Sequence, residues 1–190
     1  MIDIRTHDDT APAPGDLEIL QRFLNLHDHE PSGREVEAPI EMVRTFLIER
    51  GLLAPDADFG EAERETALAL RRALRNLIAT GGTGLAREDA EVIDRLAIEA
   101  GLHPHFHAGR APTLEPRGEG VPAALGRLVA IAFLATFDGS FAHLKLCADP
   151  TCGAVFYDRS KNRSGRWCRM EVCGNRAKVR AWRERQRRRA

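Results

Sequence analysis

Apolar residues recur at helical spacing through most of the first 140 positions of the chain. Near the start, Leu17, Leu20, Phe23 and Leu24 fall on one helical face, and Asp16 precedes them as a suitable N-cap. The same spacing returns in three further segments, at about residues 39–50, 59–79 and 87–100. Glycines stand at or just after the ends of these segments, where they favour helix termination. The pattern predicts four short amphipathic helices.

The hydrophobic pattern changes after residue 101. Residues 102–118 contain two short stretches flanked by glycine and proline, which predict a small β-hairpin. Residues 122–137 are apolar almost all round a helix, with Pro122 in the first turn, so they predict the buried central helix of an N-terminal domain. Residues 1–15 are polar and proline-rich, and we expect them to form a loose leader.

No segment of the sequence predicts a membrane span or export. The best apolar run, residues 125–137, is shorter than the roughly 18 residues that a span requires, and it contains Arg127. The first sixteen residues contain no apolar segment of the signal-peptide type. We therefore expect a cytoplasmic protein that has no membrane partner.

Charge divides the chain into an acidic part and a basic part, although the formal net charge is zero. Residues 141–190 contain 14 Lys and Arg against 4 Asp and Glu, whereas the first 140 residues contain 14 against 24. A basic segment favours binding to a polyanion, because cations that neutralise phosphates release condensed counterions. A solubilising tail, or a basic surface that docks on the acidic part of the same chain, remains an alternative.

All four cysteines lie in the last 44 residues, at Cys147, Cys152, Cys168 and Cys173. Four residues separate the members of each pair and fifteen separate the pairs, so that two turns can chelate one ion between them. Two disulfides or four unrelated thiols are the alternatives. The expected compartment and the even pairing favour one structural zinc ion. Four thiolates leave no open position for a catalytic water.

The residues around the cysteines predict a specific arrangement. Residues 154–158 resemble a strand, 159–165 a polar turn and 166–168 a returning strand, and a helix starts at Cys173 and runs to about Arg189. Knuckle, hairpin and helix in this order are typical of a treble clef. We therefore expect an α+β protein, with a mainly helical domain and small hairpin over residues 16–143 and a treble-clef zinc finger over 144–190.

The predicted finger carries basic side chains on its helix and on its polar turn. Four arginines of the helix are spaced at i, i+4, i+7 and i+11 and share one face. Arginine is suited to bidentate contacts with phosphate or guanine, and Asn175 is suited either to adenine or to capping the helix. Trp167 and Trp182 are expected to pack against the metal site. The candidate nucleic-acid-binding residues are Arg159, Lys161, Arg163, Arg166, Asn175, Arg176, Arg180, Arg183 and Arg187.

The run Cys-Gly-Asn-Arg at residues 173–176, directly after a Trp-Cys-x4-Cys unit, resembles the CGNR zinc-finger family of bacteria. The likeness covers about residues 144–185. In that family the finger follows a helical ABATE domain, and the segments RFLN (22–25) and IEMVRTFLIERGLL (40–53) are similar to its landmarks. The chain departs from the family pattern at Leu26 and Gly165, where threonine and a basic residue are common.

This resemblance implies a stress-responsive transcription regulator that binds DNA and is not an enzyme. It also implies an N-terminal domain that binds an unidentified ligand, with Asn25 as a candidate contact. The alternative is a zinc-stabilised protein-interaction module or an RNA-binding module.

Other candidate chemistry in the sequence is sparse. His103, His105 and His107 alternate, so on a strand they would project from one face, as metal ligands or as ordinary surface residues. No serine-hydrolase elbow, phosphate-binding glycine loop or HExxH motif is present in the sequence.

Overall fold

The computed structural model describes residues 10–29 and 35–188. The helices predicted from the hydrophobic spacing are present, with ends within a few residues of the expected ones. They are α1 (Leu17–Leu24), α2 (Ile40–Glu49), α3 (Glu61–Ala79), α4 (Arg87–Glu99) and α5 (Gly120–Phe137). The predicted hairpin is also present, as strands β3 (His103–His105) and β4 (Thr113–Glu115). A short antiparallel pair that the hydrophobic pattern did not predict joins β1 (Asp28–His29) to β2 (Glu35–Val36).

Helix α5 is the centre of the N-terminal core, as its uniformly apolar sequence predicted. Its residues Ala124, Leu125 and Leu128 are wholly or almost wholly buried, and α1 and α4 pack against it. Helix α4 approaches so closely that a Cβ on Gly126 would lie 2.3 Å from the Cβ of Ala100. By length and composition α5 could cross a membrane, with a mean hydropathy of 1.7. Half of it is buried inside the protein, as expected for a core helix.

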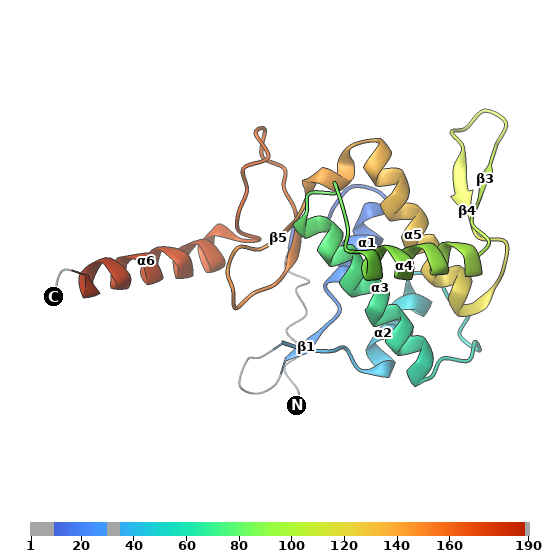
Figure 1. Ribbon diagram of the computed structural model, residues 1–190, viewed down its shortest axis with the longest axis horizontal. Coiled ribbons are helices and arrows are strands. Elements are labelled where there is room, and N and C mark those ends of the chain that lie inside the picture. Colours follow the sequence, from blue (N-terminus) through green and yellow to red (C-terminus); the bar gives the residue numbers. More distant parts are fainter. Residues whose placement is uncertain (1–9, 30–34, 189–190) are drawn as a thin grey trace.

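The C-terminal part begins with the 3-10 turn η2 (Ser140–His143) and strand β5 (Leu144–Leu146), which pairs with β6 (Val155–Tyr157). A π-helical turn, η3 (Met170–Gly174), leads into the final helix α6 (Asn175–Arg187). In Figure 1, α6 extends away from the helical domain at one end of the molecule, and the β3–β4 hairpin projects at the opposite end. The chain is thus an α+β protein with a mainly helical N-terminal part, as expected.

The strand pairing of the C-terminal part differs from the prediction. Strand β6 pairs with β5, which precedes the first cysteine pair, and residues 166–168 form no strand. A single backbone hydrogen bond, from the Ala148 amide to the Arg166 carbonyl at 2.8 Å, ties the returning segment to the knuckle. The predicted 154–168 hairpin is therefore wrong. The alternating Leu144 and Leu146 supply the partner strand instead, because they pack on the main core.

The expected loose leader is also wrong for the part that the structure describes. Thr10 and Ala13 are buried. The Ala13 amide donates to the Gln21 side-chain oxygen at 2.7 Å, and the Gln21 amide donates to the Thr10 hydroxyl at 3.2 Å. Residues 10–15 are held because a buried glutamine of α1 needs hydrogen-bond partners. Residues 1–9 lie outside the described residues.

Candidate metal centre

The first cysteine pair lies in a tight knuckle between β5 and β6. The Cys147 amide donates to the Ala154 carbonyl at 2.8 Å, and the Cys152 amide donates to the Asp149 carbonyl at 2.9 Å. Gly153 has φ +65°, a left-handed conformation that glycine adopts without strain. The knuckle therefore turns both thiols to the same side. The second pair comes from the segment around η3, with Cys168 two residues before η3 and Cys173 within it.

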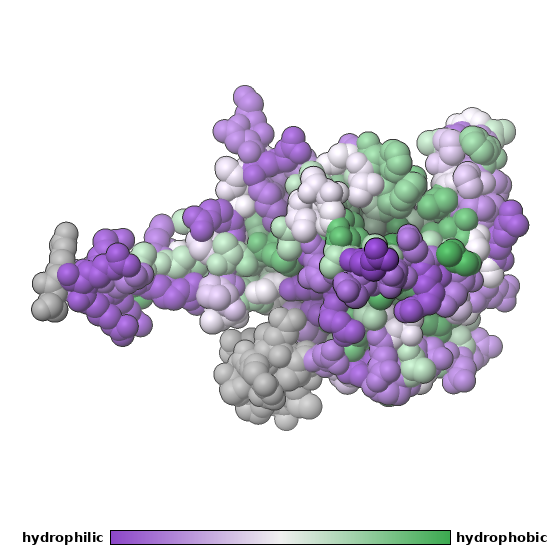
Figure 2. Space-filling view, in the orientation of Figure 1, coloured by the Kyte–Doolittle hydropathy of each residue, from purple (hydrophilic) through white to green (hydrophobic). Residues whose placement is uncertain are grey.

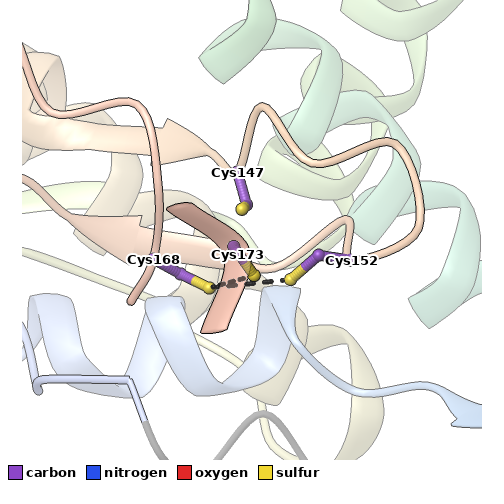
Figure 3. A group of neighbouring side chains, drawn as sticks. All are labelled: Cys147, Cys152, Cys168 and Cys173. Atoms are coloured by element: carbon purple, nitrogen blue, oxygen red, sulfur yellow. Dashed lines mark hydrogen bonds between the residues drawn. The ribbon is translucent and has the colours of Figure 1, made fainter. Parts of the chain in front are cut away.

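The four sulfur atoms converge on one point, as Figure 3 shows. All four Sγ atoms lie within 4.8 Å of one another. The Sγ of Cys168 is 3.6 Å from those of both Cys152 and Cys173. Thiolates bound tetrahedrally at about 2.3 Å from zinc would be about 3.8 Å apart, so these spacings fit one zinc ion. None of the four is in a disulfide.

The environment of the four sulfurs favours binding of a cation. Hydrogen bonding with Cys147 raises the pKa of Cys152 to about 12 and also raises the pKa of Cys168. The same interactions lower the pKa of Cys147, because one thiolate is stabilised by its protonated neighbours. Four crowded sulfurs can all be thiolates only around a positive ion. The four cysteines are therefore positioned to bind one zinc ion in a closed, four-sulfur site, which is structural.

A buried carboxylate in the knuckle anchors α6. Asp149 is fully buried. Its Oδ2 lies 2.9 Å from Nε of Arg176, and its Oδ1 lies 2.9 Å from Nη2 of Arg180. Burial alone would raise the pKa of Asp149, but hydrogen bonds from Thr151 and Arg180 and the charge of Arg176 outweigh it and lower the pKa. The first turns of α6 are therefore fixed to the knuckle by ion pairs.

The residues of the CGNR run have structural roles in this centre. Cys173 is a ligand, and Arg176 donates to the Cys173 Sγ at 3.3 Å in addition to its pairing with Asp149. The Asn175 side chain donates to the Glu171 carbonyl at 2.8 Å, which fastens the start of α6 to η3. A Cβ on Gly174 would lie 2.3 Å from the Met170 sulfur. The run builds the metal site and the helix start.

The loop that follows β6 is organised by a second buried carboxylate. Asp158 accepts hydrogen bonds from Lys145 Nζ at 2.7 Å, from the Ser160 amide at 2.9 Å and from the Gly165 amide at 2.8 Å. Burial would raise the pKa of Asp158, but these bonds, with the one from Lys145 the largest, lower it. A Cβ on Gly165 would lie 2.6 Å from the carboxylate. This close approach explains why residue 165 is glycine and not a residue with a side chain.

The nine candidate nucleic-acid-binding residues fall into two groups in the structure. Five have partners within the protein: Asn175, Arg176 and Arg180 as described, Arg159, which donates to the Pro12 carbonyl at 2.7 Å, and Arg166, whose guanidinium lies 5.3 Å from the Trp167 ring centre. The other four, Lys161, Arg163, Arg183 and Arg187, are exposed. None of these four has an ion pair within the part of the chain that the structure describes.

The two tryptophans behave differently from each other. Trp167 is partly buried against the cysteine cluster, as expected. Trp182 is 55% exposed on α6, so the expectation that it packs against the metal site is wrong. Helix α6 extends away from the helical domain (Figure 1), so this part of it lies largely in solvent.

Asn25 joins the helical domain to the finger. It is buried at the end of α1, where its amide donates to the Val155 carbonyl at 2.8 Å and its oxygen accepts from the Val155 amide at 2.7 Å. Arg75 donates to the Gly153 carbonyl at 2.6 Å across the same junction. Val155 and Leu144 belong to the main hydrophobic core. Both hydrogen-bonding ends of the Asn25 amide are thus used within the protein, and a ligand contact at Asn25 stays a prediction.

Together, a mainly helical domain and a closed four-cysteine centre that carries a basic helix define a zinc-finger protein. The family model for the CGNR zinc finger matches residues 143–186. The ABATE model, described as "Putative stress-induced transcription regulator", matches residues 17–140. Since that match covers more than half of the chain, the protein belongs to the ABATE family, with a CGNR zinc finger at its C-terminal end. No protein with curated annotation matches the chain.

Proposed function

We propose that this protein is a cytoplasmic, DNA-binding transcription regulator that is not an enzyme. In this proposal the finger presents the outer part of α6 and the tip of the 159–166 loop to DNA. The observation that carries it is the division among the basic residues. Arg176 and Arg180 fix the helix to the knuckle, whereas Arg183 and Arg187 extend beyond it into solvent.

The position of α6 favours this proposal over docking on the acidic part of the chain. The helix extends away from the helical domain (Figure 1), and its free end is covered by hydrophilic residues (Figure 2). The ion pairs that α6 makes with another segment all go to Asp149 of the knuckle, among the residues that the structure describes. A helix of 13 residues is about 20 Å long, enough to lie in a major groove.

The loop after β6 supplies a second basic surface. Asp158 holds its base, and its exposed tip carries Lys161 and Arg163. Arg163 has φ +49°, an unusual conformation for a residue other than glycine. Its carbonyl accepts a hydrogen bond from Lys145 Nζ, which holds this conformation. A tip held in this way can contact phosphate without first being ordered, which reduces the entropic cost of binding.

The proposal is tested with a double variant, Arg183→Ala with Arg187→Ala, on zinc-loaded protein. Its matched control is Arg87→Ala with Arg95→Ala, which removes the same charge from exposed positions of α4. We expect the first variant to bind duplex DNA at least about tenfold more weakly and the control to bind as the wild type does. Equal affinity of the two variants would contradict the proposal.

A competition experiment separates DNA binding from the alternatives. Labelled duplex DNA is bound to the protein and competed with unlabelled duplex, structured RNA and heparin. The proposal predicts that duplex DNA competes best at equal phosphate concentration. Better competition by RNA would favour an RNA-binding module. Absence of DNA binding at low salt would contradict the proposal and favour a protein-interaction module.

We further propose that the helical domain senses a small ligand in a cavity of about 330 Å³ between α3, α4 and α5. Its floor contains the buried Leu96, Val121 and Leu125, and its edge carries the exposed carboxylates of Asp58 and Glu99. An apolar floor with an acidic edge suits a small organic cation that carries an apolar group.

A thermal-shift screen of alkyl and aryl ammonium compounds tests this proposal. We expect at least one to raise the unfolding temperature of the wild type but not of Asp58→Asn with Glu99→Gln. An equal rise in both proteins would place the ligand elsewhere. A regulatory role also requires that the ligand change DNA affinity.

A further inference from the structure

The β3–β4 hairpin lies far from the finger (Figure 1). It brings histidines and a glutamate together on one face. In the strand register His103 faces Glu115, and His105 faces Thr113. Because alternate residues of a strand share a face, these four side chains lie on the same side of the hairpin. His107, two residues beyond His105, joins them. Nothing in the zinc finger or in the proposed DNA contacts uses this cluster.

The donor atoms of three of these residues converge. His105 Nδ1 lies 2.9 Å from Oε2 of Glu115, and His107 Nε2 lies 3.4 Å from Oε1 of Glu115. One donor atom from each of the three residues lies within 4.8 Å of the others. Ligands bound at about 2.1 Å to one cation are roughly 3.0–3.5 Å apart, whether the geometry is tetrahedral or octahedral. We propose that His105, His107 and Glu115 form a second metal site, which binds a divalent transition-metal ion.

The chemistry of these donors limits the class of ion. Two imidazoles and one carboxylate suit zinc, nickel, copper or iron, whereas magnesium and calcium prefer oxygen ligands alone. Glu115 is available as an anion, because hydrogen bonds from Thr113 and His105 lower its pKa to about 2. The side chain of His105 is 51% exposed and that of Glu115 is 40% exposed, so an ion can reach them from solvent. Three protein ligands leave positions for water or for a further donor.

Two neighbours must adjust when the ion binds. The Thr113 hydroxyl lies 2.8 Å from Nε2 of His107 and donates to Oε1 of Glu115 at 2.6 Å, so it must turn away from both ligand atoms. Arg110 is the second neighbour. Arg110 Nη2 lies 3.2 Å from Nδ1 of His107, so in the metal-free protein this nitrogen accepts a hydrogen bond and the proton lies on Nε2. When a metal binds Nε2, the ring proton moves through solvent to Nδ1, so Arg110 then faces a second donor and a nearby cation. Arg110 is exposed and free to turn away. The arginine therefore opposes metal binding, which gives the proposal a distinctive test.

The test uses tag-free protein that carries one zinc ion per chain at the cysteines. It is titrated with NiCl₂ by calorimetry, while NMR follows the histidine ring signals. We expect one equivalent of nickel to bind and the signals of His105 and His107 to change first. His105→Ala with His107→Ala should abolish this binding, and Glu115→Gln should weaken it at least about tenfold.

Two further variants separate a metal site from hydrogen bonding alone. Arg110→Ala should tighten nickel binding about threefold, because it removes a competing hydrogen bond and a nearby positive charge. His103→Ala is the matched control and should bind nickel as the wild type does, since His103 is outside the converging set. The proposal is overturned if the wild type binds no nickel, or if the double histidine variant still binds one equivalent.

Discussion

The helical domain and the finger are stabilised in different ways. The helical domain surrounds α5, which buries ten of its 18 residues. The separate buried cluster of the finger consists of Cys147, Cys152, Ala154, Phe156 and Cys173, three of which are metal ligands. Apolar burial therefore stabilises the helical domain. In the finger, whose buried cluster is small, bound metal supplies most of the stabilisation. Removal of zinc should unfold one region and spare the other.

The largest expected effect is that of losing a ligand. Cys173→Ser should abolish stoichiometric zinc binding, because the four-sulfur site loses one of its ligands. The effect on folding is large, since structural zinc in small fingers contributes on the order of 10 kcal/mol to folding. Elemental analysis measures the zinc, and limited proteolysis should cut the variant after residue 146 while α1–α5 stay protected. Chelation of the wild type followed by added zinc is the reversible control. A variant that still holds one zinc ion per chain would show that the four-sulfur site is wrongly assigned.

The next largest effect is expected from a substitution at the junction between the two regions. Asn25→Ala leaves the Val155 amide without its partner and weakens the bonding of its carbonyl, both buried, so we expect a loss of about 2–4 kcal/mol in unfolding free energy. Asn76→Ala removes an exposed hydrogen bond to Asp89 and serves as the control, with an expected loss under about 0.5 kcal/mol. Chemical denaturation measures both. Equal losses would mean that Asn25 does not join the regions.

A smaller effect is expected at the close contact between α4 and α5. Gly126→Ala places a Cβ 2.3 Å from the Ala100 Cβ, so the helices must separate. Overpacking of this kind costs typically about 1–3 kcal/mol. The gain in helix propensity from replacing glycine offsets up to about 1 kcal/mol of this cost. Thermal unfolding measures the net loss, and zinc content should not change. A stabilised variant would contradict the packing described for α5.

An effect of similar size is expected at the anchor of α6. Asp149→Asn removes the charge that pairs with Arg176 and Arg180, and we expect about 1–3 kcal/mol of lost finger stability, since both arginines are partly exposed. The folded-state pKa of Asp149 is lowered, so its stabilisation is complete above the unfolded pKa, near 4. It is lost as the pH falls through the folded-state value.

That titration gives a second readout for the same variant. The difference in stability between the wild type and Asp149→Asn should be constant at neutral pH and shrink below about pH 4. Acid also protonates the zinc thiolates, so the comparison is made between variants at matched zinc content. A difference that does not depend on pH would mean that the charge of Asp149 contributes nothing.

The sequence predicted the helices and the cysteine site because both have short-range signals. Hydrophobic spacing locates a helix, and two cysteine pairs locate a chelate. The pairing of β5 with β6 was missed because strands of three residues carry too little alternation. Gln21 and Asn25 stand four residues apart on the buried side of α1. A polar pair on an apolar stripe signals a buried hydrogen-bonded junction.

The roles of the arginines could be predicted only in part. Spacing correctly indicated that Arg176 and Arg180 share a face, but their partner Asp149 is distant in sequence. One signal for this pairing was available in the sequence. An acidic residue stands between two zinc-binding cysteines, and a basic helix follows the last cysteine. Glu115 was missed for a similar reason, because its place beside the histidines depends on the hairpin register. Residues that the fold brings together from distant parts of the sequence produce no pattern in the local hydrophobic periodicity.

The central claim is that the inner arginines of α6 hold the helix while the outer ones bind DNA. Its most direct test compares the salt dependence of DNA affinity in Arg183→Ala/Arg187→Ala with that of the wild type, at equal zinc content. The account predicts one zinc ion per chain in both proteins and a slope of log affinity against log salt that is about two units shallower in the variant. An unchanged slope, with DNA binding intact, would contradict it.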